Sequence, residues 1–296
     1  MLARSKRPRP HLDDKILVDW NGLLISSLAF GSRVLNEPRY REAAQKAADF
    51  ILNHCRNEQG RLFHRYRDGQ SAILGMIDDY AFFIHGLLDL YEATFEIFYL
   101  KEAHRLTEEM IRLFWDEERG GFFFTAHDGE QLILRQKEIY DGAVPSGNSI
   151  AALDFLRIYH FTFSQLLEQR FERLCDAFTT EIARLPSAYV QLLIAFDFFV
   201  GPSLEIIVAA HNHDAQVDTI VAEIYRGFIP NKIVALNLLS DRRTKEVIEL
   251  IPFIKEKTPL QGKPTVYICE HHACQPPITD FDQLKGKLAK NSTTIS

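Results

Sequence analysis

The chain is poor in the features that would place it in several protein classes. Four cysteines in 296 residues are too few for a disulfide-based scaffold of this size. No apolar run approaches the roughly eighteen residues of a membrane-spanning helix. The basic start from Arg4 to Arg9 leads into His-Leu-Asp-Asp, which is unlike a signal peptide. A net charge of -6 disfavours nucleic acid as a partner. We expect a soluble cytoplasmic protein that binds neither nucleic acid nor membrane.

The cysteines are also poorly placed for metal or redox chemistry. Cys55 and Cys175 lie in apolar helical patterns and are expected in the core. Cys269 and Cys274 enclose two histidines, and this combination can hold zinc, but no second ligand pair is present. A redox pair needs two cysteines separated by two residues, and this spacing is different. We therefore expect no metal and no cofactor.

What the chain does contain is an internal repeat of about sixty residues. Each unit opens with an aspartate beside an aromatic residue: Asp19-Trp20, Asp79-Tyr80 and, in swapped order, Tyr140-Asp141. Other landmarks recur at the same spacing, among them Tyr40 and Tyr99, Gly60 and Gly121, and the Asp-Gly pairs at 68–69 and 128–129. The period indicates an array of similar structural units.

The pattern within a unit predicts two helices followed by a β-hairpin. In the first unit, apolar residues follow helical spacing from Asp19 to Val34, and Pro38 suits the first turn of the next helix. Residues 60–69 then show an alternating pattern that ends in Asp-Gly, which is typical of a β-hairpin turn. Residues 120–129 repeat this segment. In the third unit, Ser146 or Asn148 caps a helix. This helix is followed by a partner helix at 164–184 and by a very apolar helix at 189–200. We expect the apolar helix to be a buried wall.

The pattern changes near Pro202. Three β-branched runs at 205–210, 232–236 and 264–269 alternate with helical segments at 214–225, 244–254 and 281–288. This alternation predicts a small parallel sheet with right-handed crossovers. We therefore divide the chain into a basic tail (1–11), a helical portion (12–201), an α/β tail (202–290) and a disordered C-terminus (291–296).

Several motifs occur in an order that resembles one family. They are the run from Arg7 to Leu17 with Trp20-Asn21-Gly22-Leu23, then Asp78-Asp79-Tyr80-Ala81, the run from Tyr140 to Ser149, and Cys274-Gln275-Pro276-Pro277. The same order is found in the spermatogenesis-associated protein 20 family, also called the YyaL-like or thioredoxin-domain-containing family. The resemblance covers almost the entire chain.

The resemblance implies a thioredoxin-like domain followed by an (α/α)6 toroid of the six-hairpin glycosidase and N-acylglucosamine 2-epimerase type. This chain shows only three helical pairs and one extra helix, and no thioredoxin-like part. We therefore expect a mainly α fold, a partial (α/α)6 toroid with a small C-terminal α/β segment. It looks like the C-terminal portion alone, either a gene fragment or a chain that completes its ring with a partner, because an open ring exposes apolar helix faces.

The heads of successive inner helices converge in such a toroid, and this predicts the site. Glycoside chemistry needs two carboxyl groups across a sugar, and Asp79 and Asp141 are the candidate acid and base. The other candidates are aromatic residues for stacking and polar residues for orienting hydroxyl groups: Trp20, Tyr80 and Tyr140, and Asp19, Asn21, Asp78, Ser146, Asn148 and His64.

Aspartates before helices are also common N-caps. Capping is the favoured role for Asp19, whereas Asp78 would cap its helix and leave Asp79 spare. For Asp141, a site residue and a turn residue are both open interpretations.

Histidines offer a second route, because epimerases of this fold class use histidine as acid and base. His64 and His127 fall in the two predicted hairpins, near the mouth of the cleft. His85 and His104 lie among apolar helix neighbours and are expected as hydrogen-bonded core residues.

Two functions of different class follow. One is a carbohydrate-active or epimerase-like enzyme acting on a sugar-like small molecule at the toroid rim, with Asp79 and Asp141 about 5 to 10 Å apart. The alternative is a non-catalytic scaffold that pairs with a thioredoxin-like partner or an N-terminal-half chain, in redox or protein quality control. A filled cleft without opposed carboxylates would favour the scaffold.

Overall fold

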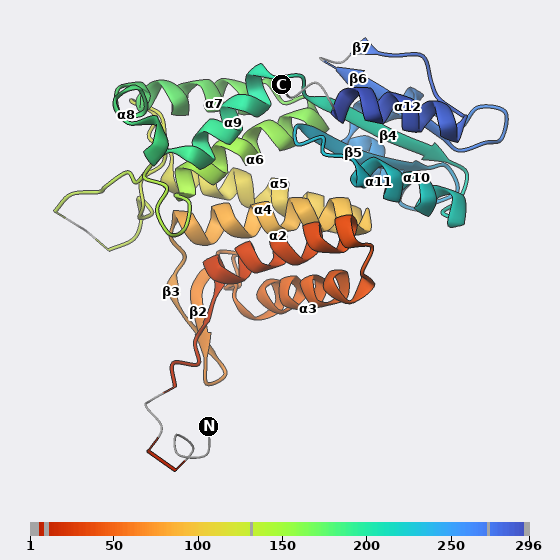
Figure 1. The fold of residues 1–296 in the computed structure, drawn as a ribbon. Coiled ribbons are helices and arrows are strands. Elements are labelled where there is room, and N and C mark those ends of the chain that lie inside the picture. The colour runs from red at the N-terminus through yellow and green to blue at the C-terminus, as the bar shows by residue number, and fades with distance from the viewer. Residues whose placement is uncertain (1–5, 9–11, 131–132, 271–272, 293–296) are drawn as a thin grey trace.

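A computed structural model describes residues 6–8, 12–130, 133–270 and 273–292 of the chain (Figure 1). The predicted basic tail therefore lies mostly outside the described residues. Helices form the N-terminal two thirds, and a mixed α/β segment follows at the C-terminal side. No described helix combines the length and apolar character that crossing a membrane requires.

The helices form two rows, as expected for part of an (α/α)6 toroid. Helices α2, α4, α6 and α9 lie side by side in an inner row, and α3, α5 and α7 pack behind them (Figure 1). The bounds are α2 Val18–Leu35, α3 Pro38–His54, α4 Ile77–Thr94, α5 Ile97–Phe114, α6 Gly147–Thr162, α7 Gln165–Ala177, α8 Thr179–Arg184 and α9 Val190–Val200, with a 3-10 turn at Pro186–Ala188. Pro38 stands in the first turn of α3, as predicted.

Two glycines allow the inner helices α2 and α4 to touch through their backbones. A Cβ atom at Gly22 would lie 2.5 Å from the carbonyl carbon of Phe82, and one at Gly86 would lie 2.7 Å from the carbonyl oxygen of Gly22. Both distances are far below van der Waals contact. The close crossing therefore depends on the absence of side chains at these two positions.

The inner helices α2, α4 and α6 end in the same way. Asn36, Phe95 and Phe163 follow their last turns with φ of 51°, 54° and 58°, and each donates its backbone N–H to the helix. Asparagine tolerates this left-handed conformation, whereas phenylalanine pays about 1 kcal/mol or more for it. The two rings are held by packing: Phe163 stacks on Phe253 with ring centres 4.7 Å apart, and Phe95 packs against buried apolar residues of both the helical portion and the C-terminal α/β segment.

The first predicted hairpin is confirmed and the second is not. Strands β2 (Phe63–Arg67) and β3 (Gln70–Leu74) pair antiparallel, and Asp68 and Gly69 between them both have positive φ, as a tight hairpin turn requires. The short strand β1 (Ile16–Leu17) adds to β2. In the second unit, only an isolated bridge joins Trp115 to Phe122 among the described residues. The chain does return, since the backbone N–H of Phe124 donates to the carbonyl of Gln136 at 2.7 Å, but no second strand pair forms among the described residues.

The apolar helix α9 is not the buried wall that its composition predicts. Ala195 is fully buried, but Val190 is 53% exposed and Ile194 is 46% exposed. Helix α2, at the other end of the inner row, also exposes apolar side chains, including Trp20 and Phe30. Helices α2 and α9 stand at the two ends of the row, so each has a neighbouring inner helix on one side only. The predicted partner helix at 164–184 is also interrupted, at Phe178, into α7 and α8.

The α/β tail forms a mixed rather than a parallel sheet. Its strands are β4 (Leu204–Ala210), β5 (Lys232–Leu238), β6 (Thr265–Glu270) and β7 (Ala273–Cys274), in the order β5-β4-β6-β7. Its helices are α10 (Ala215–Arg226), α11 (Thr244–Leu250) and α12 (Phe281–Ser292), and a 3-10 turn spans Pro252–Glu256. Strand β5 is parallel to β4, but β6 is antiparallel to it: β6 begins at Thr265, which pairs with Ala209 near the end of β4. The seven-residue helix α11 does not carry the chain back to the start of the sheet before β6 begins.

The ends of this tail also differ from expectation. Cys269 and Cys274 form a disulfide across the β6–β7 pair, so they are neither free thiols nor metal ligands. The two histidines between them lie outside the described residues. Helix α12 extends to Ser292, so the first two residues of the predicted disordered C-terminus are helical, and residues 293–296 are not described.

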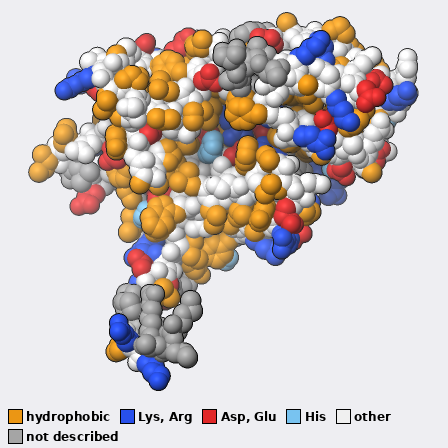
Figure 2. Space-filling model, viewed as in Figure 1, with side chains coloured by type: hydrophobic (Ala, Val, Ile, Leu, Met, Phe, Trp, Pro, Cys, Tyr) orange, Lys and Arg blue, Asp and Glu red, His pale blue; other side chains and the backbone are white. Residues whose placement is uncertain are grey.

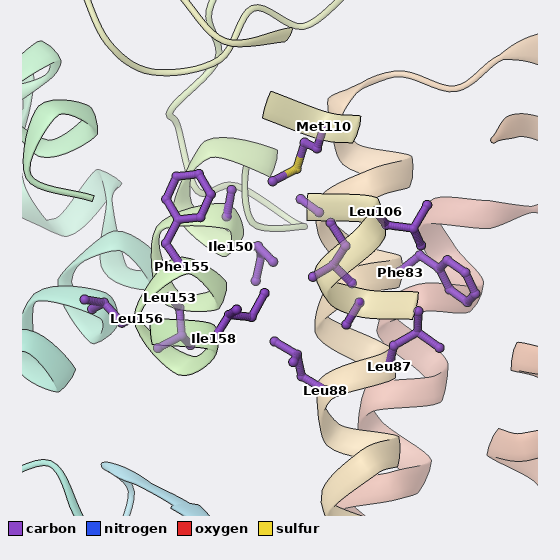
Figure 3. Close-up of a cluster of buried hydrophobic side chains, with 14 of the residues drawn as sticks. Phe83, Leu87, Leu88, Leu106, Met110, Ile150, Leu153, Phe155, Leu156 and Ile158 are labelled. Atoms are coloured by element: carbon purple, nitrogen blue, oxygen red, sulfur yellow. The ribbon is translucent and has the colours of Figure 1, made fainter. Parts of the chain in front are cut away.

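One hydrophobic core runs from the helices into the sheet. Between the second and third helical pairs, Leu88 of α4 and Met110 of α5 face Ile150 and Ile158 of α6 (Figure 3). The same cluster of buried residues includes Ile207 and Ile233 of the sheet, as well as Cys55 and Cys175, which are core residues as predicted. The tail therefore packs on the helical row and fixes one end of it.

The glycine crossing gives a test of this packing. Gly22→Ala or Gly86→Ala should lower the free energy of unfolding by about 1 to 3 kcal/mol or more, because the added methyl group meets backbone atoms that must move. Gly286 is the matched control, since it lies exposed in α12 with nothing within 4 Å of its Cβ position. Gly286→Ala should raise stability by about 0.5 to 1 kcal/mol. Urea unfolding measures all three, and equal effects would contradict the close crossing.

Candidate functional site

The N-terminal ends of α2, α4 and α6 lie at the same end of the inner row (Figure 1). The structure brings Asp19, Asp78, Asp79 and His64 together there, and this group is called the rim cluster. Asp19 belongs to the first turn of α2, and Asp78 and Asp79 to the first turn of α4. His64 reaches them from strand β2 of the hairpin.

Asp79 is the centre of the rim cluster. Its carboxyl group is 1% exposed and accepts hydrogen bonds from the backbone N–H groups of Met76 at 2.8 Å and Asp19 at 3.2 Å. The first bond caps its own helix, the role that the sequence assigned to Asp78 instead. Asp79 therefore joins the start of α2 to the start of α4, and it is the capping residue rather than the spare one.

A third hydrogen bond connects Asp79 to histidine. The Nδ1 atom of His64 lies 3.0 Å from Oδ1 of Asp79, and the imidazole is about one fifth exposed. The hydrogen bond to Asp79 raises the pKa of His64, although partial burial opposes the shift. The other ring nitrogen remains free of this bond. His64 and Asp79 thus form a pair in which the carboxyl group orients the imidazole.

Asp78 is the most perturbed acid of the rim cluster. Burial, together with the nearby charges of Asp79 and Glu138, raises its pKa to about 7. Its Oδ1 atom accepts a 2.9 Å hydrogen bond from the backbone N–H of Gly147, at the start of α6. Because the group exchanges its proton near neutral pH, Asp78 can both donate and accept a proton there.

Asp19 is half-buried, and burial and the charge of Asp79 raise its pKa. It accepts a hydrogen bond from the N–H of Trp20 at 2.7 Å. Asp19, His64 and Asp79 each offer a ligand atom within 4.8 Å of the others, so they could hold a small cation. Ligation through Nδ1 of His64 would, however, displace its hydrogen bond to Asp79.

Asp141 has a different environment from the rim cluster. Its carboxyl group accepts hydrogen bonds from the backbone N–H groups of Ser146 at 3.0 Å, Gln191 at 2.8 Å and Leu192 at 3.3 Å. It therefore binds the loop before α6 to the start of α9. These three bonds are the contacts expected of a capping and turn residue.

The remaining predicted residues divide by burial. Tyr80 is fully buried and its hydroxyl accepts the N–H of Leu62, so its ring cannot stack on a ligand, which corrects that expectation. Ser146 caps α6, and Asn148, 1% exposed, bonds the backbone of Phe122, so both are structural rather than ligand-binding residues. Trp20 and Tyr140 are 64% and 67% exposed and are free to stack. The half-buried Asn21 donates to the carbonyl of Leu17.

A second group of charged side chains lies about three to four helical turns further along the inner helices. Arg33 of α2 and Arg157 of α6 converge on Asp89 and Glu92 of α4, with N···O distances of 2.9 and 3.0 Å to Asp89. Although burial opposes it, the two arginines hold the pKa of Asp89 well below its usual range. Tyr225 of α10 donates to Glu92 at 3.1 Å and connects the tail to this buried network.

His85 borders the same network. Its Nδ1 atom lies 2.7 Å from Asp154, which is completely buried, and its Nε2 atom lies 3.7 Å from Asp89. The sequence predicted a hydrogen-bonded core histidine at this position; the hydrogen bond is confirmed, but the side chain is 15% exposed rather than fully buried. The sequence reading gave Arg33, Asp89 and Arg157 no role. Charged residues at helical spacing on an otherwise apolar helix, such as Asp154 and Arg157 on α6, could have indicated a buried charged network, because almost all residues of α6 are buried.

The arrangement of the helices places the fold in one class, the six-hairpin glycosidase-like toroids. A cellobiose 2-epimerase from Bacillus thermoamylovorans aligns with a TM-score of 0.50 and 17% identity over 90% of this chain and 68% of its own. An α-mannanase from Bacteroides thetaiotaomicron aligns with a TM-score of 0.51 and 16% identity over 76% of this chain and 61% of its own. At these identities, the likeness shows the fold alone.

Within that class, the chain matches the C-terminal portion of the spermatogenesis-associated protein 20 family, as its motifs indicate. It is 34% identical to the human protein of that name and 32% identical to the rat protein, over 97% of this chain in each case. The chain spans 37% of the length of these relatives. No protein-family model matches it.

The environment of Asp78 predicts a dependence of stability on pH. The raised pKa means that the native state keeps this proton up to about pH 7, whereas an unfolded aspartate loses it near its model value of 3.8. The raised pKa of Asp78 therefore lowers the free energy of unfolding progressively from about pH 4 to pH 7, and the loss stays constant at higher pH. Asp78→Asn should raise the free energy of unfolding by about 1 to 3 kcal/mol at pH 8, allowing for partial exposure.

The same two proteins compared at pH 4 provide the internal control. At pH 4 the native carboxyl group keeps its proton and the unfolded one is only about half ionised, so the difference in unfolding free energy between wild type and Asp78→Asn should be much smaller than at pH 8. Urea unfolding at a series of pH values measures this. A difference that is the same at pH 4 and pH 8 would show that burial does not perturb Asp78.

Proposed function

We propose that the rim cluster binds and processes a carbohydrate or sugar-like small molecule by proton transfer. The observation that carries the proposal is the convergence of Asp78 with the His64–Asp79 pair at the ends of the inner helices. Two groups that exchange protons near neutral pH are what general acid and base catalysis needs. In this proposal Asp78 donates the proton, His64 accepts one, and Asp79 acts as a positioning residue.

The hydrogen bonds support these roles over a pairing of Asp79 with Asp141. Asp79 is buried beneath two backbone N–H groups and His64, and Asp141 is engaged by three backbone N–H groups. Neither carboxyl group is free to contact a sugar directly. Asp78 accepts only one backbone bond among the described residues and so retains capacity for a ligand.

Exposed aromatic rings support a sugar-like ligand. Trp20 is next to Asp19 of the rim cluster, and Tyr140 precedes the loop that leads into α6. Apolar faces of sugar rings stack on such side chains, and neither ring has a packed position that would explain its size. The epimerase and the mannanase of similar fold are sugar enzymes by their names, and this agrees with the same ligand class.

A turnover and binding screen tests the proposal. Wild type is assayed against a panel of neutral mono- and disaccharides that includes cellobiose, and any activity found is compared in Asp78→Asn and His64→Gln. Each substitution should lower turnover by about 10²- to 10⁴-fold, the usual contribution of a general acid or base. Turnover should also fall as pH rises above about 7, where Asp78 loses its proton.

His127→Gln is the matched control. His127 lies close to the corresponding position in the second repeat unit, but its Nδ1 atom faces the carbonyl of Leu113 at 3.2 Å rather than a carboxyl group. Its substitution should leave turnover unchanged. If His64→Gln and His127→Gln behave alike, His64 has no part in the reaction.

A second function is favoured by the uncovered ends of the inner row. Leu24 of α2 and Val190 of α9 are each about half exposed, in contrast to the apolar residues of α4 and α6. We propose that these faces bind further helical hairpins supplied by a longer polypeptide of the same family, in keeping with the scaffold alternative. A thioredoxin-like partner would join through such a polypeptide.

Co-expression with the remaining portion of a spermatogenesis-associated protein 20 chain tests this second function. A one-to-one complex should form on size-exclusion chromatography, and Leu24→Asp should weaken it, because a charge in an apolar contact is costly. Ser27→Asp on the same helix, at an already polar position, is the control. Separate elution of the two wild-type chains would contradict the proposal.

A further inference from the structure

A cleft of about 350 Å³ opens between the two ends of the inner row, away from the rim cluster. Phe30 of α2 and Ile194 of α9 stand on its walls, and Arg157 and His85 line it from the helices between. Residues at the start of β5, including Lys232, close the end nearest the tail. Figure 2 shows this hollow near the centre of the face, with histidine and basic side chains visible among hydrophobic ones.

The charges that line the cleft do not balance. Arg33, Arg157 and Lys232 are basic, whereas Asp89 and Glu92 are the only carboxylates among the described residues that line it. The two arginines already saturate these carboxylates. Behind the wall, Asp154 pairs with His85. Among the side chains that line the cleft, cations therefore outnumber carboxylates by one, and an unpaired charge in a largely buried place is costly.

Arg157 has hydrogen-bonding capacity directed into this space. Its side chain is 8% exposed, and its bonds to Asp89 at 3.0 Å and Glu92 at 3.4 Å both use Nη2. Within the described part of the chain, its Nε and Nη1 atoms make no hydrogen bond. Neither atom is fully enclosed, because the enclosed polar atoms without a partner do not include them. Both atoms therefore have access to the cleft that Arg157 lines. A guanidinium edge of this kind matches the oxygens of a carboxylate or phosphate group.

Lys232 is the second cation without a carboxylate of its own. Its Nζ atom donates to the carbonyl of Ile229 at 2.7 Å and lies 5.1 Å from the ring centre of Tyr225. Burial lowers its pKa to about 8; the charge of Glu92 opposes this shift, and the nearby arginines add to it. An anion in the cleft would relieve this repulsion, since it would lie near Lys232 and Arg157 together.

We propose that this cleft binds a small molecule that carries one carboxylate or phosphate group on an otherwise neutral, sugar-sized body. Arg157 and Lys232 face the anion, and Phe30 and Ile194 contact the apolar part of the ligand. The volume suits a single small ligand and is at the lower end of small-molecule pockets. The proposal goes beyond the proton-transfer function of the rim cluster and does not depend on it.

Calorimetric titration of the 296-residue chain with three related probes tests the charge requirement. The probes are glucose, glucuronate and glucose 6-phosphate, which share a sugar ring and differ in charge. At least one charged probe should bind about tenfold or more tightly than glucose, a difference of about 1.4 kcal/mol. The comparison of the two charged probes then separates a carboxylate ligand from a phosphate ligand.

Two variants at one exposed position locate the binding. Ile194 is 46% exposed on the wall of the cleft, so its substitution should leave the fold intact. Ile194→Asp and Ile194→Asn have nearly the same size and differ in charge. Ile194→Asp should weaken the charged probe by about tenfold relative to Ile194→Asn, and circular dichroism should show both variants folded.

Three results would overturn the proposal. They are binding of glucose as tightly as the charged probes, no binding of any probe at 10 mM (about -2.7 kcal/mol), or equal loss of anion binding in Ile194→Asp and Ile194→Asn. None of these results would affect the rim cluster, because the saccharide screen there uses neutral sugars and different variants. A loss of turnover in Asp78→Asn would likewise leave the cleft proposal standing.

Discussion

The buried network of Arg33, Asp89, Glu92 and Arg157 is the interaction on which the arrangement of the inner helices depends. It joins three parallel helices midway along their length, where most of the other facing residues are apolar and could pack in more than one register. Charges that have left water must find defined partners, so the network allows one alignment of α2, α4 and α6. Tyr225 extends the same constraint to the tail. The alignment in turn places the rim cluster at one end of the row and the cleft along its open side.

Much of the fold could be predicted from the sequence because the repeat is regular. The helical pairs, the first hairpin and the alternation of the tail follow from local spacing, turn residues and caps, which act within a few residues. The errors concern contacts between distant segments. The direction of β6 depends on how far α11 carries the chain, and the exposure of α9 depends on what lies beside it. The pairing of Cys269 with Cys274 depends on a two-residue strand that no pattern marks.

The sequence indicated the position of the proposed site better than its chemistry. The repeated aspartates mark the helix ends that converge, and His64 lies beside them, but their role in binding or catalysis stays a prediction. Sequence alone could not tell which aspartate of the pair at 78–79 caps its helix, because both spacings allow it and the choice depends on the start of α2. The partners of His64 and Arg157 come from 15 or more residues away, and only the folded chain brings them together.

The left-handed residues that end the inner helices have a consequence for cooperativity. Phe95 and Phe163 hold a conformation that their own backbone disfavours, and contacts with the tail hold them in it. The strain is thus located in one part of the chain and its compensation in the other. Neither part keeps its full stability without the other, so the helical row and the α/β tail are expected to unfold in a single transition and to exchange their core amide protons together.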